Sequence, residues 1–218
     1  MASSRALCFA DSLMPSLTVG LFSEDAAQEE FLTAVLRRLA TEGGARVVVH
    51  PVSSRGGHGR ALDEFKTYHR ALASGIGPAA QLIVVAIDGN CTQWNTVRGE
   101  ILQSVAPPHP APIVPACPDP HIERWYMADP VSFSQVVGAQ PRLEHTKCER
   151  GRYKALLQEA IRNGGHTPTL GGIEFARELV EAMDLYRAGQ NEASLRSFLR
   201  DCRGNLNELI GDHVRPRI

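Results

Sequence analysis

Short apolar runs alternate with amphipathic stretches over roughly the first 130 residues of the chain. Four runs are rich in strand-forming residues: 18–22, 46–52, 81–87 and 112–116. Three intervening stretches are predicted as helices: 26–41, 61–73 and 97–105. This alternation predicts an α/β fold in which helices flank a mostly parallel sheet.

The runs differ in character, and this predicts their places in the sheet. Residues 81–87 (QLIVVAI) are almost continuously apolar, which is typical of a central strand buried on both faces. Pro51 indicates that the second run either ends early or lies at an edge. Asp119 and Pro120 predict the start of a helix that continues to about residue 127, with Asp119 as its cap.

The later part of the chain is predicted to be helical. Residues 130–150 show no regular pattern, and residues 151–163 predict a helix. A helical pair joined at Gly189 is predicted for residues 173–187 and 192–203. We therefore expect a tail over 1–17, a Rossmann-like α/β domain over 18–165, and a C-terminal helical extension over 166–218 that packs on the same domain.

Composition narrows the class of protein. The net charge of −1 gives no global attraction to nucleic acid or to anionic lipid. The five cysteines are widely spaced with no C-x-x-C pair, which favours reduced thiols and argues against a zinc site. The N-terminus is a poor signal peptide, and no apolar run approaches the ~20 residues that a membrane span needs. We expect a cytoplasmic protein with no membrane association.

Acidic residues follow the predicted strands. Glu24 follows the first strand, Asp88 follows the central strand, and Glu123 and Asp129 flank the predicted helix after the fourth strand. Carboxylates at neighbouring strand ends converge in space, and such oxygen ligands suit Mg²⁺ or Mn²⁺. Each acid also has a structural explanation when it is taken alone, as a first-turn helix residue, a turn residue or a helix stop.

Taken together, these segments resemble the TOPRIM superfamily. The segments are LFSEDAAQEEFL at 21–32, IVVAIDGN at 83–90 and ERWYMAD at 123–129. They are most similar to small standalone TOPRIM-like proteins related to OLD-type nucleases. The resemblance implies that Glu24 acts on a metal or as general base and that Asp88 binds the metal. It also implies that Glu123 and Asp129 are supporting metal ligands and that Lys154 is a basic residue near the scissile phosphate.

Two positions depart from the family pattern. Asn90 stands where a second aspartate is usual, and Gln28 stands where the nuclease branch often has a second glutamate. An amide oxygen can still ligate a cation, but it lacks the negative charge. The departures predict weaker binding, one metal instead of two, or a site that has lost its activity.

Basic residues suggest two places for nucleic-acid contacts. Arg55 and Arg60 lie in the glycine-rich segment 53–60, which can equally be a mobile surface loop. Lys147, Arg150 and Arg152 form a basic cluster, but nearby glutamates make a mixed surface an alternative.

The leading hypothesis is a metal-dependent nuclease that acts on nucleic acid, with DNA as the expected substrate. By the resemblance, it would be the effector subunit of an ATPase-containing, anti-phage assembly with an ABC-type ATPase partner. Two alternatives stay open: a catalytically degenerate interaction or scaffold subunit, and a nucleotide-binding regulator that uses the glycine-rich loop. Homo-oligomers are compatible with each.

Overall fold

The computed structural model describes residues 14–54, 60–105, 111–149 and 151–214. Four strands form a parallel sheet in the order β2-β1-β3-β4. Their bounds are β1 (Ser16–Ser23), β2 (Arg46–Ser53), β3 (Leu82–Ala86) and β4 (Ile113–Ala116). The predicted α/β fold is confirmed. Every residue of β3 is buried, as expected for a central strand, and β2 with its Pro51 lies at the edge.

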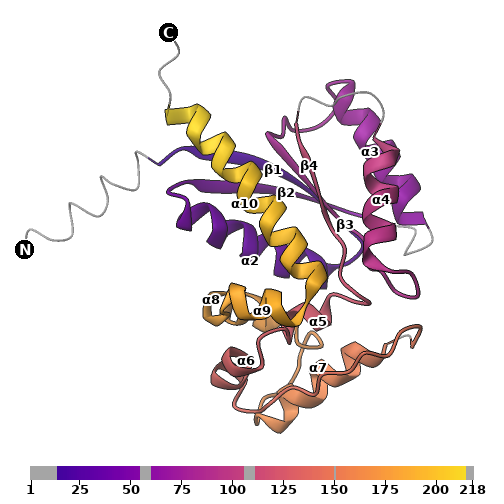
Figure 1. Ribbon diagram of the computed structural model, residues 1–218, viewed down its shortest axis with the longest axis vertical. Helices are drawn as coiled ribbons and strands as arrows, with labels where there is room; N and C mark the ends of the chain where they lie inside the picture. Colours follow the sequence, from indigo (N-terminus) through magenta and orange to yellow (C-terminus); the bar gives the residue numbers. More distant parts are fainter. Residues whose placement is uncertain (1–13, 55–59, 106–110, 150, 215–218) are drawn as a thin grey trace, which may run out of the picture.

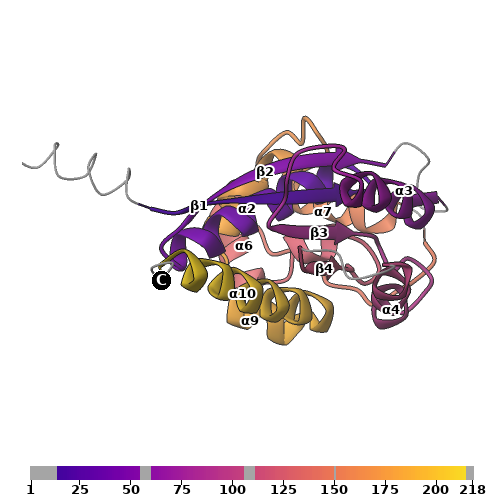
Figure 2. The same ribbon diagram turned by 90° about the horizontal axis from the view of Figure 1, so that it is seen from above.

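Helices cover both faces of the sheet. The connections between successive strands are α2 (Ala26–Glu42), α3 (Ala61–Ala73) and α4 (Trp94–Ser104). Alternate strand residues point to opposite faces, so Leu21 packs in the cluster that contains α2 and Phe22 in the cluster that contains α3 and α4. Figures 1 and 2 show α2 on one face and α3 and α4 on the other. The change of face puts a topological switch point between β1 and β3.

The C-terminal helices share the core on the α2 face. They are α8 (Ala176–Ala182), α9 (Leu185–Asn191) and α10 (Ala193–Val214), preceded by the short 3₁₀ turn η2 (Ile173–Phe175). The predicted helical pair is therefore wrong in its boundaries, because Gly189 lies within α9. The chain breaks instead at Asp184 and again at Glu192, between α9 and α10. The side chain of Asp184 accepts hydrogen bonds from the backbone N–H groups of Tyr186 and Arg187.

Two further predictions for the segment after β4 are corrected. The helix expected from Asp119 begins later, as α5 (Glu123–Tyr126). The segment before it pairs with the loop after β3, since the carbonyl of Pro118 accepts from the N–H of Gly89. The region 130–150 is not wholly irregular, because α6 (Pro130–Val137) starts with Pro130 in its first turn. The predicted helix at 151–163 is present as α7 (Arg152–Asn163).

The cysteines also depart from the prediction. Cys91 and Cys148 form a disulfide with 4.7 Å between their Cα atoms, which joins the β3–α4 loop to the segment before α7. The prediction of reduced thiols is therefore wrong for this pair, which is separated by 57 residues in the sequence. Cys117 and Cys202 are free and buried, and Cys8 lies outside the described residues. In the described part of the chain, no helix combines the length and apolarity that a bilayer crossing requires.

Candidate functional site

Two central strands bring Glu24 and Asp88 to the same edge of the sheet. β1 and β3 are parallel neighbours with Phe22 opposite Val85, and both acids follow the carboxyl ends of these strands. The switch point lies between these same two strands. In open parallel sheets, this crevice is where ligands bind.

Gln28 links the two acids. Its side-chain Nε2 donates to Oδ1 of Asp88 at 2.8 Å and lies 3.4 Å from Oε2 of Glu24. Its Oε1 accepts from the backbone N–H of Glu24 at 2.8 Å. The same Glu24 oxygen accepts from the backbone N–H of Asp88 at 2.9 Å. One buried glutamine amide thus holds both carboxylates within 3.4 Å of a single nitrogen.

His121 completes the surroundings of Asp88. Its Nδ1 lies 2.9 Å from Oδ2 of Asp88, and its ring packs 6.0 Å from that of Tyr153. The sequence does not indicate a role for His121, because a single histidine in the loop after β4 belongs to no recognisable spacing pattern. Both oxygens of Asp88 therefore have polar partners, Gln28 on one side and His121 on the other.

The electrostatics of Asp88 follow from its burial. The residue is 8% exposed, and burial raises the pKa of its carboxyl to about 7. The hydrogen bond from His121 opposes this rise, while the negative charges of Glu24 and Glu123 add to it. Asp88 consequently exchanges a proton close to neutral pH, and a cation beside it would favour the ionised form.

Glu123 and Lys154 meet at a neighbouring cavity of about 220 Å³. Asp25, Tyr126 and Gly171 also line it. Burial raises the pKa of Glu123, and the charge of Asp25 raises it further, whereas the charge of Lys154 lowers it. Lys154 itself is exposed on α7, so its ammonium group is accessible from solvent.

Asn90 has a conformational role in the loop after β3. Its φ is +53°, in the left-handed region that asparagine tolerates better than most residues. Its backbone N–H donates to the carbonyl of Pro120 at 2.8 Å, which ties this loop to the segment after β4. This conformation suits a short polar residue at position 90, asparagine or aspartate alike.

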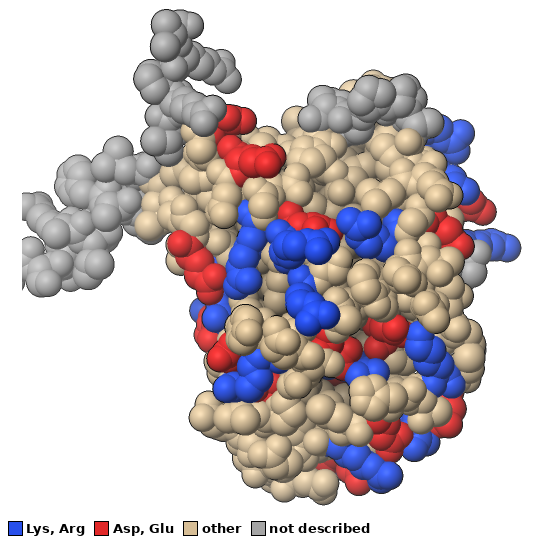
Figure 3. Space-filling model, viewed as in Figure 1, with Lys and Arg blue, Asp and Glu red and all other residues tan. Residues whose placement is uncertain are grey.

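The predicted basic cluster is paired with nearby acids. Lys147 lies 2.6 Å from Oδ1 of Asp119, and Arg152 forms ion pairs with Glu144 and Glu149. Arg60 is exposed just before α3, while Arg55 and Arg150 lie outside the described residues. Figure 3 shows that lysine and arginine side chains instead gather over α10, in the middle of the face it draws.

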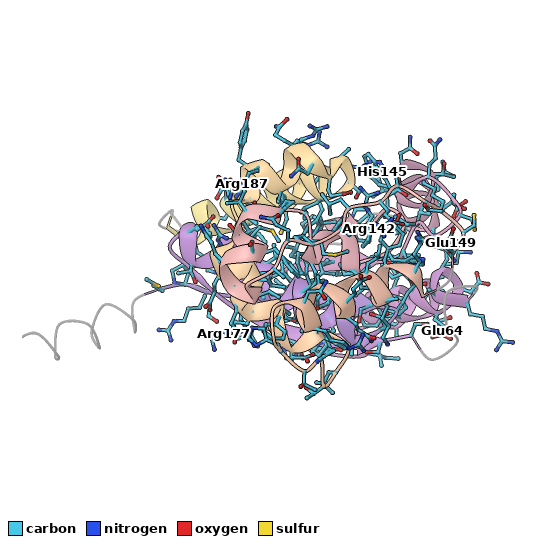
Figure 4. All side chains as sticks on the ribbon, turned by 90° about the horizontal axis from the view of Figure 1, so that it is seen from below. Glu64, Arg142, His145, Glu149, Arg177 and Arg187 are labelled. Atoms are coloured by element: carbon cyan, nitrogen blue, oxygen red, sulfur yellow. A yellow bond between two sulfur atoms is a disulfide. The ribbon has the colours of Figure 1, made fainter. Side chains whose placement is uncertain are left out.

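Asp129 has a different set of partners from the other predicted acids. Arg187 of α9, labelled in Figure 4, donates to its Oδ1 at 2.5 Å and to its Oδ2 at 2.7 Å. The backbone N–H of Asp184 also donates to Oδ2 at 2.9 Å. Burial opposes ionisation here, but the hydrogen bonds from Arg187 and Ser132 hold the pKa of Asp129 well below its usual range. These contacts fix the α8–α9 junction.

The positions of the acidic residues decide which kind of metal site they can form. Within the described ranges, no group of three or more His, Cys, Asp or Glu residues is arranged to hold a metal ion. Glu24 and Asp88 nevertheless fit a site of a different kind, since Mg²⁺ is often held by one or two carboxylates together with water and substrate phosphates. No protein-family model, curated protein or solved structure matches the chain.

Proposed function

We propose that the protein is a divalent-metal-dependent phosphodiesterase that acts on nucleic acid, with one Mg²⁺ or Mn²⁺ held by Glu24 and Asp88. The observation that carries the proposal is the shared Gln28 amide, which brings two carboxylates together at the switch point of the sheet. An acidic residue that only starts a helix or forms a turn would not require a glutamine amide shared with a second carboxylate.

A divalent cation at this position would supply positive charge to a phosphoryl oxygen and would lower the pKa of a coordinated water. The protein's own groups orient the ligands. Gln28 and His121 each fix one oxygen of Asp88, and the Asp88 backbone N–H fixes Glu24.

Glu123 and Lys154 extend the proposal to the adjoining cavity. The ammonium group of Lys154 would interact with the negative charge that develops on a phosphate. Glu123 would not contact the cation directly. Its negative charge raises the pKa of Asp88, and it attracts the ammonium group of Lys154. Asn90 lies two residues after Asp88 in the same loop and would add an amide oxygen at most.

The wider setting of the proposal comes from the family resemblance. It implies DNA as substrate, a cytoplasmic location and an ABC-type ATPase partner. The helices α8 to α10 are the proposed docking surface for such a partner.

One observation favours a second function, that of a catalytically degenerate interaction subunit. Both oxygens of Asp88 already have protein partners, so the network is satisfied by Gln28 and His121 without a metal. In this alternative, the switch-point network is a buried polar anchor, and the protein acts by binding a partner.

A cleavage assay separates the two functions. Fluorescent single-stranded and double-stranded DNA would be incubated with the full chain and Mn²⁺ or Mg²⁺, and fragments resolved on a denaturing gel. Glu24→Gln and Asp88→Asn should each lower the rate by about 100-fold or more, whereas Glu149→Gln, at an exposed acid, should not. Cleavage that survives in both site variants would contradict the proposal, and a wild-type protein that neither binds Mn²⁺ nor cleaves would support the interaction subunit.

Gln28→Glu gives a second, independent readout. The substitution places a third carboxylate beside Glu24 and Asp88 and should strengthen Mn²⁺ binding if the cation lies between them. If Gln28 is only a clamp for a metal-free network, the same variant will lower the thermal stability and gain no metal affinity.

A further inference from the structure

A groove between α4 and α10 carries an excess of positive charge. It has a volume of about 390 Å³ and is lined by Trp94, Asn95 and Arg98 of α4 and by Ala193, Arg196, Ser197 and Arg200 of α10. Neither helix has an acidic residue in its first turn. Figure 3 shows this concentration of basic side chains over α10.

Two of the three arginines in the groove pair with one carboxylate, that of Asp201. Arg98 lies 3.0 Å from Oδ2 of Asp201, and Arg200 lies 2.9 Å from its Oδ1. Arg196 is exposed, and within the described ranges its guanidinium has no acidic partner. The groove is therefore left with surplus positive charge, unlike the cluster around Lys147 and Arg152.

The groove opens at the same edge of the sheet as Glu24 and Asp88. α4 starts after the carboxyl end of β3, only six residues beyond Asp88 in the chain. The start of α10 is tied to α5, after the carboxyl end of β4, by the buried Arg124–Glu192 ion pair. The indole N–H of Trp125 adds a hydrogen bond of 2.9 Å to Ser194 Oγ.

We propose that this groove binds the sugar–phosphate backbone of single-stranded nucleic acid, with Trp94 as a stacking surface for a base. Arginine presents a planar set of donors that matches phosphate oxygens, and partly exposed aromatic rings stack on bases without regard to sequence. An acidic peptide would use the arginines but would gain little from the indole. The inference deepens the proposed nuclease function, on which the choice of nucleic acid over other polyanions rests in part.

The test is fluorescence anisotropy with a labelled 20-nucleotide oligothymidylate, the full chain and EDTA, at several NaCl concentrations. EDTA removes metal chemistry, so a failure here is distinct from a failure of the Glu24–Asp88 site. Arg196→Ala and Arg200→Ala should each weaken binding about 10-fold and reduce the log–log salt slope by about 0.7. Trp94→Ala should weaken binding and leave the salt slope unchanged.

The matched controls are Arg37→Ala and Arg177→Ala, at exposed arginines on α2 and α8 that lie outside the groove. Both should bind like the wild type. Circular dichroism spectra would verify that each variant is folded. Equal losses in the control and groove variants, or no binding by the wild type at low salt, would overturn the proposal. Displacement of the oligonucleotide by polyglutamate, with no effect of Trp94→Ala, would overturn it in favour of an acidic peptide partner.

Discussion

The buried ion pair between Arg124 and Glu192 gives a quantitative test of how α10 is held. Their side chains are 8% and 5% exposed, and the Arg124 guanidinium also lies over the ring of Tyr153. Arg124→Met keeps most of the apolar stem but leaves the glutamate without its counter-charge. Loss of one partner from a buried pair costs about 3–5 kcal/mol of unfolding free energy. We expect a loss in this range at pH 8.

The cost should depend on pH because the stranded carboxyl can take up a proton. Burial raises the pKa of Glu192 to about 7, and the charge and hydrogen bond of Arg124 oppose this rise. Without Arg124 the pKa rises further, so the neutral carboxyl prevails at pH 5. The loss should then fall to about 1–2 kcal/mol, the cost of an imperfectly bonded neutral group. The double variant with Glu192→Gln should be more stable at pH 8 than Arg124→Met alone by about 1 kcal/mol or more.

Urea unfolding followed by circular dichroism at pH 5 and pH 8 would measure these differences. Arg177→Met is the matched control, since Arg177 and Glu181 form an exposed pair with side chains 79% and 59% accessible. We expect no measurable change for it. A loss below about 1 kcal/mol for Arg124→Met at pH 8, or a loss that is the same at both pH values, would refute the reasoning.

Three further predictions concern the site and its supports. Burial raises the pKa of Asp88 from 3.8 to about 7, so the protonated carboxyl stabilises the fold fully below about pH 4. This contribution, on the order of 4 kcal/mol, is lost as the pH rises through 7. Asp88→Asn should flatten the fall in urea-unfolding free energy between pH 5 and pH 8 in EDTA, and an unchanged pH slope would contradict the assignment. Gly164→Ala should lower the unfolding free energy by at least about 2 kcal/mol, because its Cβ would lie 1.9 Å from a backbone carbonyl oxygen of α6. Gly99→Ala, in open space within α4, should instead stabilise the protein by about 0.5–1 kcal/mol. Similar effects of the two substitutions in thermal melts would refute the close contact between Gly164 and α6. Asp129→Asn should lower the melting temperature, since it weakens the contact with Arg187, but leave Mn²⁺ affinity unchanged in calorimetry; a lost metal site would return Asp129 to the ligand set.

Local patterns were sufficient to predict the sheet and its covering helices. The continuous apolar run of β3 and the helical spacing of Phe31, Leu32 and Val35 each reflect burial that adjacent residues determine. The boundaries of α6 and α9 could not be predicted from local patterns. Asp129-Pro130 is compatible with a helix stop and with a helix start, and the tertiary contact with Arg187 accompanies the start.

The site could be predicted only in part, because its geometry depends on long-range contacts. Strand order brings Glu24 and Asp88 together, and acids at the ends of predicted strands signal this in the sequence. The hydrogen bond from Gln28 to Asp88 spans 60 residues, and the contact with His121 spans 33. A pattern read within one helix or loop contains no information about either contact. The pairing of Cys91 with Cys148 was missed for the same reason.

The proposed function requires that Glu24 and Asp88 together hold one divalent cation. A calorimetric titration of MnCl₂ into the full chain, with Asp88→Asn titrated in parallel, tests it most directly. We expect one binding event per chain in the wild type and none in the variant. No binding by the wild type, or equal binding by both proteins, would contradict the claim.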